Sequence, residues 1–517
     1  MLETANVPNK LETRHNALAK GGVIVAVSGI LQRARETPDA IAVVHNGVSC
    51  SYAHFARRIA ASRQYLSQQQ LPVGTIAIVD VQHMLDAWVV GFALRSLGMT
   101  TLAVGNAADI ERLDVRNVGC VVTAADEHRP APEHMPAERP ARSIRIPPGV
   151  LRADTQDEVT EFPEMTANPG GHIMMTSGTT GTYKKIVRDA HVEALALPLH
   201  AKINDITGES VVYIANFGPW TAGGYRWPLI TWSVGGTVVI HQQADAHSPL
   251  AQHDMTHIFA TPGTLGAILR APDEALRRND ATRLLVTGGA LSQAMLSAAK
   301  QRVTRQVYAV LASTEALTVA VTPLERPDDL NWHRIHPSRE VQVIDDAGNV
   351  LGPGSEGLIR IRIIDGLAGY LDDDDATRMF FRDGYFHPGD VGMFGDDGRL
   401  SLRGRESDVI NLFGDKIATG PIEQALRDRL GVEGVCMLAV TNAQGGDEIF
   451  VVIQSSQPLE QAEIDAAGKA ELRLFKRVPV RAVSIEKFPR NEMGKIERRV
   501  LKRQLIAVLA DKARNRT

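Results

Sequence analysis

Short apolar runs alternate with segments of helical periodicity over the first part of the chain. Runs that predict strands cover residues 40–44, 75–80 and 119–123, and apolar residues recur at helical spacing in residues 52–68 and 84–97. Strands that alternate with helices form parallel sheets covered by helices. The pattern therefore predicts an α/β architecture for this region.

A second alternating series, with no internal sequence repeat, extends to about residue 310. Its predicted strands cover residues 211–215, 237–240, 257–260, 284–287 and 306–310. After about Ser338 the strands become short and their connections hairpin-like, which predicts a smaller antiparallel barrel or sheet. These short strands cover residues 340–344, 357–362 and 398–402.

A last unit is predicted from about Gly404 onward, with the mixed pattern of a small α+β domain. Its helical and strand-like segments cover residues 422–430, 435–440, 448–453 and 461–473. Four consecutive aspartates at residues 372–375 precede it, and they predict a helix start or a solvated turn rather than a metal site.

Composition sets the class of protein. The chain has 517 residues, 44% of them hydrophobic, which is more than one core needs, so two or more domains are expected. A net charge of −4 does not indicate nucleic acid or an anionic membrane as the main partner. Three widely spaced cysteines offer no disulfide framework or zinc spacing, and no apolar run is long enough to span a membrane. We therefore expect a cytoplasmic protein.

Residues 176–185, Thr-Ser-Gly-Thr-Thr-Gly-Thr-Tyr-Lys-Lys, have the chemistry of a phosphate-binding loop. Glycine lets backbone N–H groups approach an anion, hydroxyl groups donate to its oxygens, and lysine neutralises its charge. The loop follows a predicted strand and precedes a helical pattern at residues 190–197, so we expect it at a strand-to-helix junction. It is not a P-loop, because Gly181 and Lys184 are not adjacent. The alternative is a solvated turn.

Five later stretches add further chemistry. Thr287-Gly-Gly-Ala-Leu-Ser and Ala312-Ser-Thr-Glu-Ala each follow a predicted strand. An acid, an Arg–Asp pair and a lysine then occur on glycine-containing turns in residues 384–390, 404–414 and 489–495. In this order and spacing, the stretches resemble the adenylate-forming enzymes, the superfamily of acyl-CoA synthetases, non-ribosomal peptide adenylation domains and beetle luciferases. The resemblance runs from about Ile30 to about Leu501.

The resemblance implies a fold and a reaction. The fold would be a large N-terminal AMP-binding domain, residues 1–404, of two α/β subdomains plus a small β-barrel, and a small mobile α+β C-terminal domain, residues 405–517. ATP, with Mg2+, and a carboxylic acid would give acyl-adenylate and pyrophosphate. A thiol would then capture the acyl group after the C-terminal domain rotates about a hinge at Asp408, a domain alternation.

The resemblance also assigns roles to single residues. The β- and γ-phosphates would be held by Thr176, Ser177, Gly178, Thr179, Thr180, Gly181 and Lys184. The adenine would lie against Gly288, Gly289 and Ala290, and the ribose would bind Asp390 with help from Arg405. The catalytic residues would be Lys495, which bridges the carboxylate and the α-phosphate, Thr314, which donates to the α-phosphate, and Glu315, which is the ligand of Mg2+.

Each assignment has a structural alternative. Glu315 is alternatively a surface acid, Asp390 a turn cap, Arg405 a salt-bridge partner and Lys495 one of many exposed lysines.

The chain also departs from the family pattern. Residues 183–185 are Tyr-Lys-Lys where Pro-Lys-Gly is usual, and Leu311-Ala312 replaces Tyr-Gly, so the aromatic that stacks on adenine is missing unless Tyr308 replaces it. Asn411 stands where many CoA ligases have lysine.

The substrate pocket is expected around residues 217–225. Amino-acid-activating relatives place an aspartate here and this chain has none, so a plain carboxylic acid is favoured. The bulky Trp220 and Tyr225, with Phe217, favour a small or aromatic acid, unless they are core aromatics. The expected acceptor is CoA. The alternatives are the phosphopantetheine of an acyl carrier protein, a non-thiol acceptor, and a non-catalytic nucleotide-binding relative.

Overall fold

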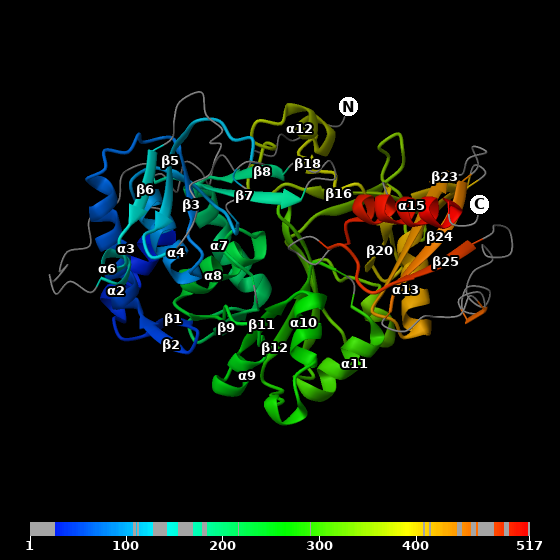
Figure 1. Ribbon diagram of the computed structural model, residues 1–517, viewed down its shortest axis with the longest axis horizontal. Coiled ribbons are helices and arrows are strands. Elements are labelled where there is room, and N and C mark those ends of the chain that lie inside the picture. The colour runs from blue at the N-terminus through cyan, green and yellow to red at the C-terminus, as the bar shows by residue number, and fades with distance from the viewer. Residues whose placement is uncertain are drawn as a thin grey trace, which may run out of the picture. The chain divides into compact units, whose positions relative to one another are not determined.

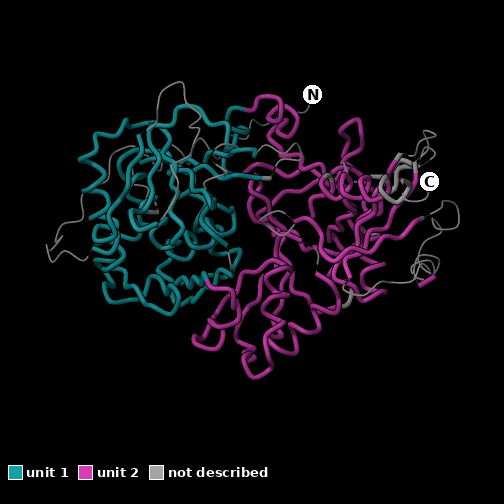
Figure 2. Tube along the Cα trace, viewed as in Figure 1, with its two compact units in different colours: residues 1–242, 365–372 teal, residues 243–364, 373–517 magenta. Residues whose placement is uncertain are grey.

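The computed structural model describes most of the chain. The described residues are 26–106, 110, 113–127, 142–153, 169–177, 183–215, 217–289, 291–406, 409–412, 415–441, 447–455, 462–463, 480–490 and 496–514. The chain divides into two compact units (Figure 2). Unit 1 is residues 1–242 with 365–372, and unit 2 is residues 243–364 with 373–517. The predicted domain boundary between residues 404 and 405 depends on the expected rotation of the C-terminal domain. The division into two units does not test that rotation, so the boundary stays a prediction.

Unit 1 contains a six-stranded sheet in the order β6-β5-β3-β4-β7-β8 (Figure 1). Its strands are parallel except for the β7–β8 pair. The strands are β3 (Ile76–Asp80), β4 (Thr100–Ala103), β5 (Val118–Ala124), β6 (Arg142–Ile146), β7 (His172–Ser177) and β8 (Tyr183–Arg188). All residues of β3 are buried, as expected for a parallel strand covered on both faces.

The two faces of β3 belong to two separate cores. Ala77 and Val79 pack in one cluster with residues of helix α4 (Met84–Ser96), while Ile76 and Ile78 pack in another with Leu113. Side chains alternate between the faces of a strand, so a continuous apolar run fills both cores at once. Helices α3 (Tyr52–Ser67) and α6 (Pro148–Arg152) also belong to this part of unit 1.

Unit 1 also contains four strands paired in the order β9-β10-β1-β2. They are β1 (Ile41–His45), β2 (Val48–Ser51), β9 (Val211–Ile214) and β10 (Thr237–Ile240), and only the β1–β2 pair is antiparallel. The associated helices are α2 (Ala26–Glu36), α7 (Ala190–Asn204) and α8 (Ala222–Val234). Phe55 and Phe92 pack around Trp232 in the core, with ring centroids 5.1 and 5.9 Å from it.

Unit 2 begins with the strands β11-β12-β13-β14, of which the first three are parallel. They are β11 (His257–Ala260), β12 (Arg283–Thr287), β13 (Val307–Ser313) and β14 (Leu317–Pro323). The helical elements here are α9 (Ser248–Gln252), α10 (Pro262–Leu269), η1 (Asp273–Ala275), α11 (Gln293–Arg302) and η2 (Pro327–Leu330). The second alternating series of the sequence is thereby confirmed.

An antiparallel six-stranded sheet follows, with the order β17-β18-β16-β19-β20 and with β15 paired to β16. The strands are β15 (Val341–Ile344), β16 (Glu356–Arg362), β17 (Phe381–Arg382), β18 (Tyr385–Phe386), β19 (Asp390–Phe394) and β20 (Leu400–Arg405). The run of four aspartates starts helix α12 (Asp374–Phe380), because the Asp373 side chain accepts the N–H of Ala376 at 2.9 Å. The prediction of a helix start is confirmed.

The C-terminal elements form a small α+β layer. Strands β23-β24-β25 make a three-stranded sheet, with α13 packed on one face through Ile422 and Leu426 and α15 on the other through Leu501 and Leu505. The elements are the hairpin β21 (Val409–Leu412) and β22 (Asp415–Ala418), then α13 (Thr419–Leu430), β23 (Gly434–Thr441), β24 (Asp447–Gln454), β25 (Val480–Ile485) and α15 (Arg498–Arg514). Most of the helix predicted at residues 461–473 lies outside the described residues.

The predicted fold class is confirmed. Parallel sheets with helices, a smaller antiparallel sheet and an α+β C-terminal part follow one another along the chain. Among the described residues, no helix combines the length and the apolar character needed to cross a bilayer.

Candidate active site

The predicted phosphate loop connects two antiparallel strands, β7 and β8, in unit 1. The expectation of a direct strand-to-helix junction is therefore wrong, because the six-residue strand β8 precedes helix α7. Thr176 lies opposite Lys184 in the hairpin, and Ser177 lies opposite Tyr183. Directly opposed residues of an antiparallel pair share a face, so Thr176 and Lys184 point to the same side of the hairpin. Four predicted loop residues, Gly178, Thr179, Thr180 and Gly181, lie outside the described residues.

The two consecutive lysines of β8 have different environments. Lys185 is 4% exposed, and its Nζ donates to the carbonyl oxygens of Leu113, at 2.9 Å, and Asp114. Lys184 is half-buried, and its Nζ lies 5.1 Å from the centroid of the Tyr370 ring. Neighbouring side chains of a strand point to opposite faces, so only Lys184 lies on the face of Thr176.

The predicted adenine and magnesium residues lie at the carboxyl ends of two adjacent parallel strands in unit 2. Gly288 follows β12 and Thr314 follows β13, and Thr287 is in register with Val310. Gly288 has φ +82°, a left-handed conformation that favours glycine. Glu315 is buried, at 8% exposure, while Thr314 is half-buried. The carboxyl edge of a parallel sheet is where α/β proteins bind ligands.

The turn that carries Thr314 and Glu315 is held by several contacts. The Ser313 hydroxyl accepts the N–H of Ala316 at 2.9 Å, and the Arg339 guanidinium donates to the Ala316 carbonyl. Leu317, directly after the turn, has φ +63°, which costs a residue with a Cβ roughly 1–2 kcal/mol. Packing of Ala316 and Val319 against the antiparallel sheet compensates for this cost and fixes the turn.

The two predicted ribose residues, Asp390 and Arg405, are cross-strand neighbours in β19 and β20. The Arg405 Nε lies 3.1 Å from the Asp390 carboxylate, and the two side chains are 44% and 24% exposed. A pair this exposed contributes at most about 1 kcal/mol to folding.

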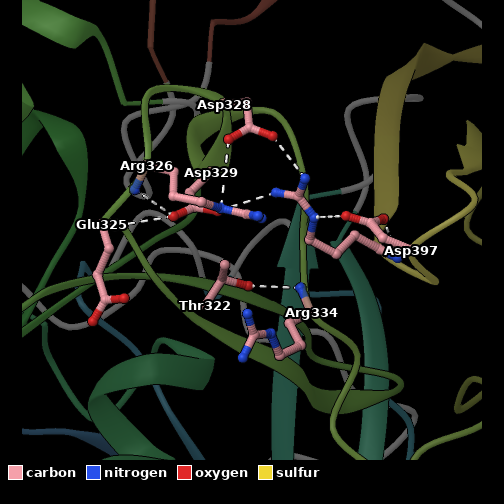
Figure 3. Close-up of polar contacts among 8 residues, drawn as sticks. Thr322, Glu325, Arg326, Asp328, Asp329, Arg334 and Asp397 are labelled. Carbon is pink, nitrogen blue, oxygen red and sulfur yellow. Dashed lines mark hydrogen bonds and ion pairs between the residues drawn. The ribbon is translucent and has the colours of Figure 1, made fainter.

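The far end of the β19–β20 hairpin is fixed by a charged cluster that sequence reasoning missed (Figure 3). Arg399 donates to Asp328, Asp329 and Asp397 at 2.6–3.1 Å. The Asp329 carboxylate also accepts the backbone N–H groups of Glu325 and Arg326. The cluster joins η2 and the residues just before it to the hairpin whose strands carry Asp390 and Arg405.

Of the predicted pocket residues, Tyr225 lies in a buried network within unit 1. Its hydroxyl donates to Glu193 at 2.7 Å and accepts from Arg95, and its ring stacks on His172 with centroids 3.8 Å apart. Arg95 and Glu193 form an ion pair at 2.8 Å with side chains 3% and 7% exposed. Burial is the main reason that the pKa of Tyr225 lies well above its usual value. These contacts favour the alternative that Tyr225 is a core aromatic.

Trp220 has a different environment from Tyr225. It is half-buried, and its indole lies so close to two glycines that a Cβ at Gly105 or Gly218 would come within 2.7 or 2.2 Å of it. Phe217 is 6% exposed, and Thr221 caps helix α8 by accepting the N–H of Gly224. The pairing of Trp220 with Gly105 is a long-range contact that no local sequence signal indicates.

Comparison with known families decides the class of protein. A model described as AMP-binding enzyme matches residues 30–371, well over half of the chain. The chain belongs to the AMP-binding enzyme family. It is an AMP-forming ligase, as the ordered motifs of the sequence predict.

Relatives and structures agree with this membership. The chain is 26% identical to the pyochelin synthase PchD of Pseudomonas aeruginosa over 90% of each protein. It is 24% identical to a 4-chlorobenzoate–CoA ligase of Arthrobacter sp over 92% of this chain and 95% of that enzyme. The fold matches Bacillus subtilis o-succinylbenzoate CoA synthetase in complex with ATP and magnesium ion, with a TM-score of 0.77, 21% identity, and coverage of 92% of this chain and 99% of the other.

The sequence comparison with the AMP-binding family predicts that the adenine-stacking aromatic is missing unless Tyr308 replaces it. The position of Tyr308 in the structure tests this hypothesis. Tyr308 is in register with Leu285, and its ring lies under the Arg283 guanidinium, 4.3 Å away, toward the amino ends of the strands. Gly288 follows the opposite, carboxyl end of β12. The hypothesis that Tyr308 replaces the missing aromatic is therefore wrong.

Glu315 fits the magnesium ligand that the AMP-binding family motif predicts. Mg2+ is usually bound by one or two carboxylates, with phosphate oxygens and water completing the octahedron. The residues that the structure describes contain no group of three or more acidic, histidine or cysteine side chains that could hold a metal ion alone. Glu315 places one buried carboxylate directly after strand β13, at the carboxyl edge of these parallel strands.

Three further predicted residues, Ala290, Asp408 and Lys495, lie outside the described residues, so their roles stay predictions.

Proposed function

We propose that this enzyme activates a small or aromatic carboxylic acid as its acyl-adenylate and transfers the acyl group to the thiol of CoA. ATP and Mg2+ are the other reactants of the first step, and pyrophosphate and AMP are released in turn.

The observation that carries this proposal is the composition of residues 217–225, which contain Phe217 and Trp220 and no carboxylate. A buried α-ammonium group of an amino-acid substrate would need an anionic partner, since burying an unpaired charge is very costly. The flat Trp220 ring, held against Gly105 and Gly218, offers an apolar wall instead. An acid without an α-amino group fits this region.

The charges of the nucleotide-side residues suit adenylation. A carboxylate and an α-phosphate are both anions, so the reaction requires cationic and hydrogen-bonding groups where they meet. Lys184 and Thr176 on one face of the β7–β8 hairpin would hold the leaving pyrophosphate. Glu315 would hold the magnesium, Thr314 would donate to the α-phosphate, and Lys495 would stabilise the charge on the reacting oxygens.

The relatives support CoA as the acceptor, because the 4-chlorobenzoate–CoA ligase is similar over 92% of this chain. A second candidate is a carrier-protein phosphopantetheine, which presents the same thiol arm as CoA. The similarity to the pyochelin synthase PchD over 90% of the chain supports the carrier-protein phosphopantetheine as this second candidate acceptor.

Carboxylate-dependent exchange of labelled pyrophosphate into ATP tests the first step. We expect exchange with aryl or short-chain acids from a panel and none with amino acids. Exchange with amino acids alone would contradict the proposed acid class. Mass spectrometry of products, first with CoA and then with a phosphopantetheinylated carrier protein, tests the acceptor. A CoA thioester without carrier product is expected, and the reverse result would establish the second candidate.

A further inference from the structure

Residues 365–372 belong to unit 1 and contact strand β8, although they follow β16 of unit 2 in the sequence. We call them the crossing segment. The crossing segment is attached at both ends. Asp365 pairs with Arg188 of β8, both side chains being 6% exposed, and the Leu371 N–H donates to the Lys185 carbonyl at 2.8 Å. Strand β8 ends the sheet order, so the crossing segment bonds to the free edge of that strand.

Tyr370 of the crossing segment reaches Lys184. Leu371 packs in the cluster that contains Leu113 and Met175, on the face of the hairpin to which Lys185 points. Tyr370, its neighbour, is 7% exposed and lies with its ring 5.1 Å from the Lys184 Nζ. A lysine ammonium within about 6 Å of a ring centroid is attracted by the negative face of the ring.

The contact matters because a lysine side chain is flexible. Four rotatable bonds separate the ammonium from the backbone, and holding it in one place costs conformational entropy unless something else holds it first. The Tyr370 ring supplies such a hold on the face that carries Thr176. Lys185 cannot replace Lys184, because its ammonium is bound to the carbonyl groups of residues 113 and 114 on the other face.

We propose that Tyr370 is a positioning residue that holds the Lys184 ammonium over its ring and thereby sets the affinity for the β- and γ-phosphates of ATP. This inference rests on the proposed function, in which Lys184 contacts those phosphates. It also accounts for the two consecutive lysines of β8. Lys185 and Arg188 attach the strand to its surroundings, and of the two lysines only Lys184 would bind the nucleotide.

Nucleotide binding to the full-length protein tests the proposal without knowledge of the acid. Isothermal titration with Mg·ATP and with AMP compares a ligand that has β- and γ-phosphates with one that lacks them. Tyr370→Leu is expected to raise the Kd of Mg·ATP about tenfold and to leave the Kd of AMP within about twofold. Tyr370→Phe, which keeps the ring, should bind both ligands as the wild type does.

A matched control and a double-mutant cycle separate positioning from a general structural role. Tyr308→Leu removes another tyrosine ring that lies under a cation, Arg283, and should change neither Kd. In a Lys184→Gln background, Tyr370→Leu should cause no further loss of ATP affinity, because the two residues act as one unit.

Three results would overturn the inference. They are an unchanged Kd of Mg·ATP in Tyr370→Leu, equal weakening of ATP and AMP, and losses that add fully in the Lys184→Gln background. A wild-type protein that binds neither nucleotide would instead contradict the proposed function itself, and with it the basis of this inference.

Discussion

Two ion pairs, one in each unit, hold charged side chains in opposite ways. In unit 1, Arg95 and Glu193 are buried, paired at 2.8 Å and bonded to the Tyr225 hydroxyl. In unit 2, the cross-strand pair of Asp390 and Arg405 is 24% and 44% exposed. A buried ion pair that loses one member leaves an uncompensated charge, whereas an exposed pair contributes little to folding.

This difference predicts that residues of the buried pair mainly affect stability, whereas residues of the exposed pair mainly affect chemistry. The buried network behind residues 217–225 is expected to determine whether unit 1 folds, while loss of the exposed pair of Asp390 and Arg405 is expected to cost little stability.

Arg95→Met should have the largest effect on folding. It leaves the Glu193 carboxylate buried without its cation, which costs about 3–5 kcal/mol in the free energy of unfolding. Urea unfolding measures this loss, and Tyr225→Phe, which removes one hydroxyl, should cost only about 1–3 kcal/mol. The panel of accepted acids should not change in Tyr225→Phe. A stable variant with an altered acid preference would instead place Tyr225 in the substrate pocket.

Lys495→Ala should affect chemistry and not folding. Loss of a group that stabilises charge at the reacting oxygens lowers the rate by about 10²–10³-fold. Pyrophosphate exchange should be nearly abolished while Mg·ATP still binds and the unfolding midpoint stays the same. Lys487→Ala, at a residue with no proposed role, serves as the control. Near-normal exchange in Lys495→Ala would refute its assigned role.

Asp390→Asn should have an intermediate effect confined to nucleotide binding. The amide cannot accept two ribose hydroxyls as the carboxylate does, so we expect about tenfold weaker binding of both ATP and AMP. Stability should change little because the pair with Arg405 is exposed. If Asp390 is only a turn residue, titration calorimetry will show wild-type affinity for both nucleotides.

Acid pH should have the smallest effect, at the Arg399 cluster. Hydrogen bonds from Arg399 hold the pKa of Asp328 and of Asp397 below the usual value. A depressed carboxyl pKa stabilises the folded state above the unfolded pKa of about 3.9, and this stability is lost as the pH falls through the folded pKa. Asp397→Asn should therefore lower Tm slightly at neutral pH and not at about pH 2. A difference in Tm that grows toward low pH would contradict this sign.

The elements and residues that depend on local chemistry could be predicted from the sequence. Glycines at strand ends, the Thr314–Glu315 turn and the aspartate cap of α12 each require particular residue types within a few positions. The structure places the first two at adjacent strand ends. Their roles toward ATP remain predictions.

The residues that depend on distant partners could not be predicted. Strand β8 contains Lys184, Lys185 and Arg188, so its polar pattern does not indicate a buried strand. Carbonyl groups near residue 113 and the carboxylate of Asp365 make that burial possible, and both are far away in the sequence. Tyr225 and Trp220 likewise depend on partners more than a hundred positions away, Arg95 and Gly105.

We expect this enzyme to join an acid to CoA through an adenylate. The most direct measurement is a simultaneous assay of nucleotide and acyl products from ATP, Mg2+, CoA and an acid selected by pyrophosphate exchange. We predict equal amounts of AMP, pyrophosphate and acyl-CoA. Formation of ADP and phosphate, or AMP release without any acyl thioester, would contradict the account.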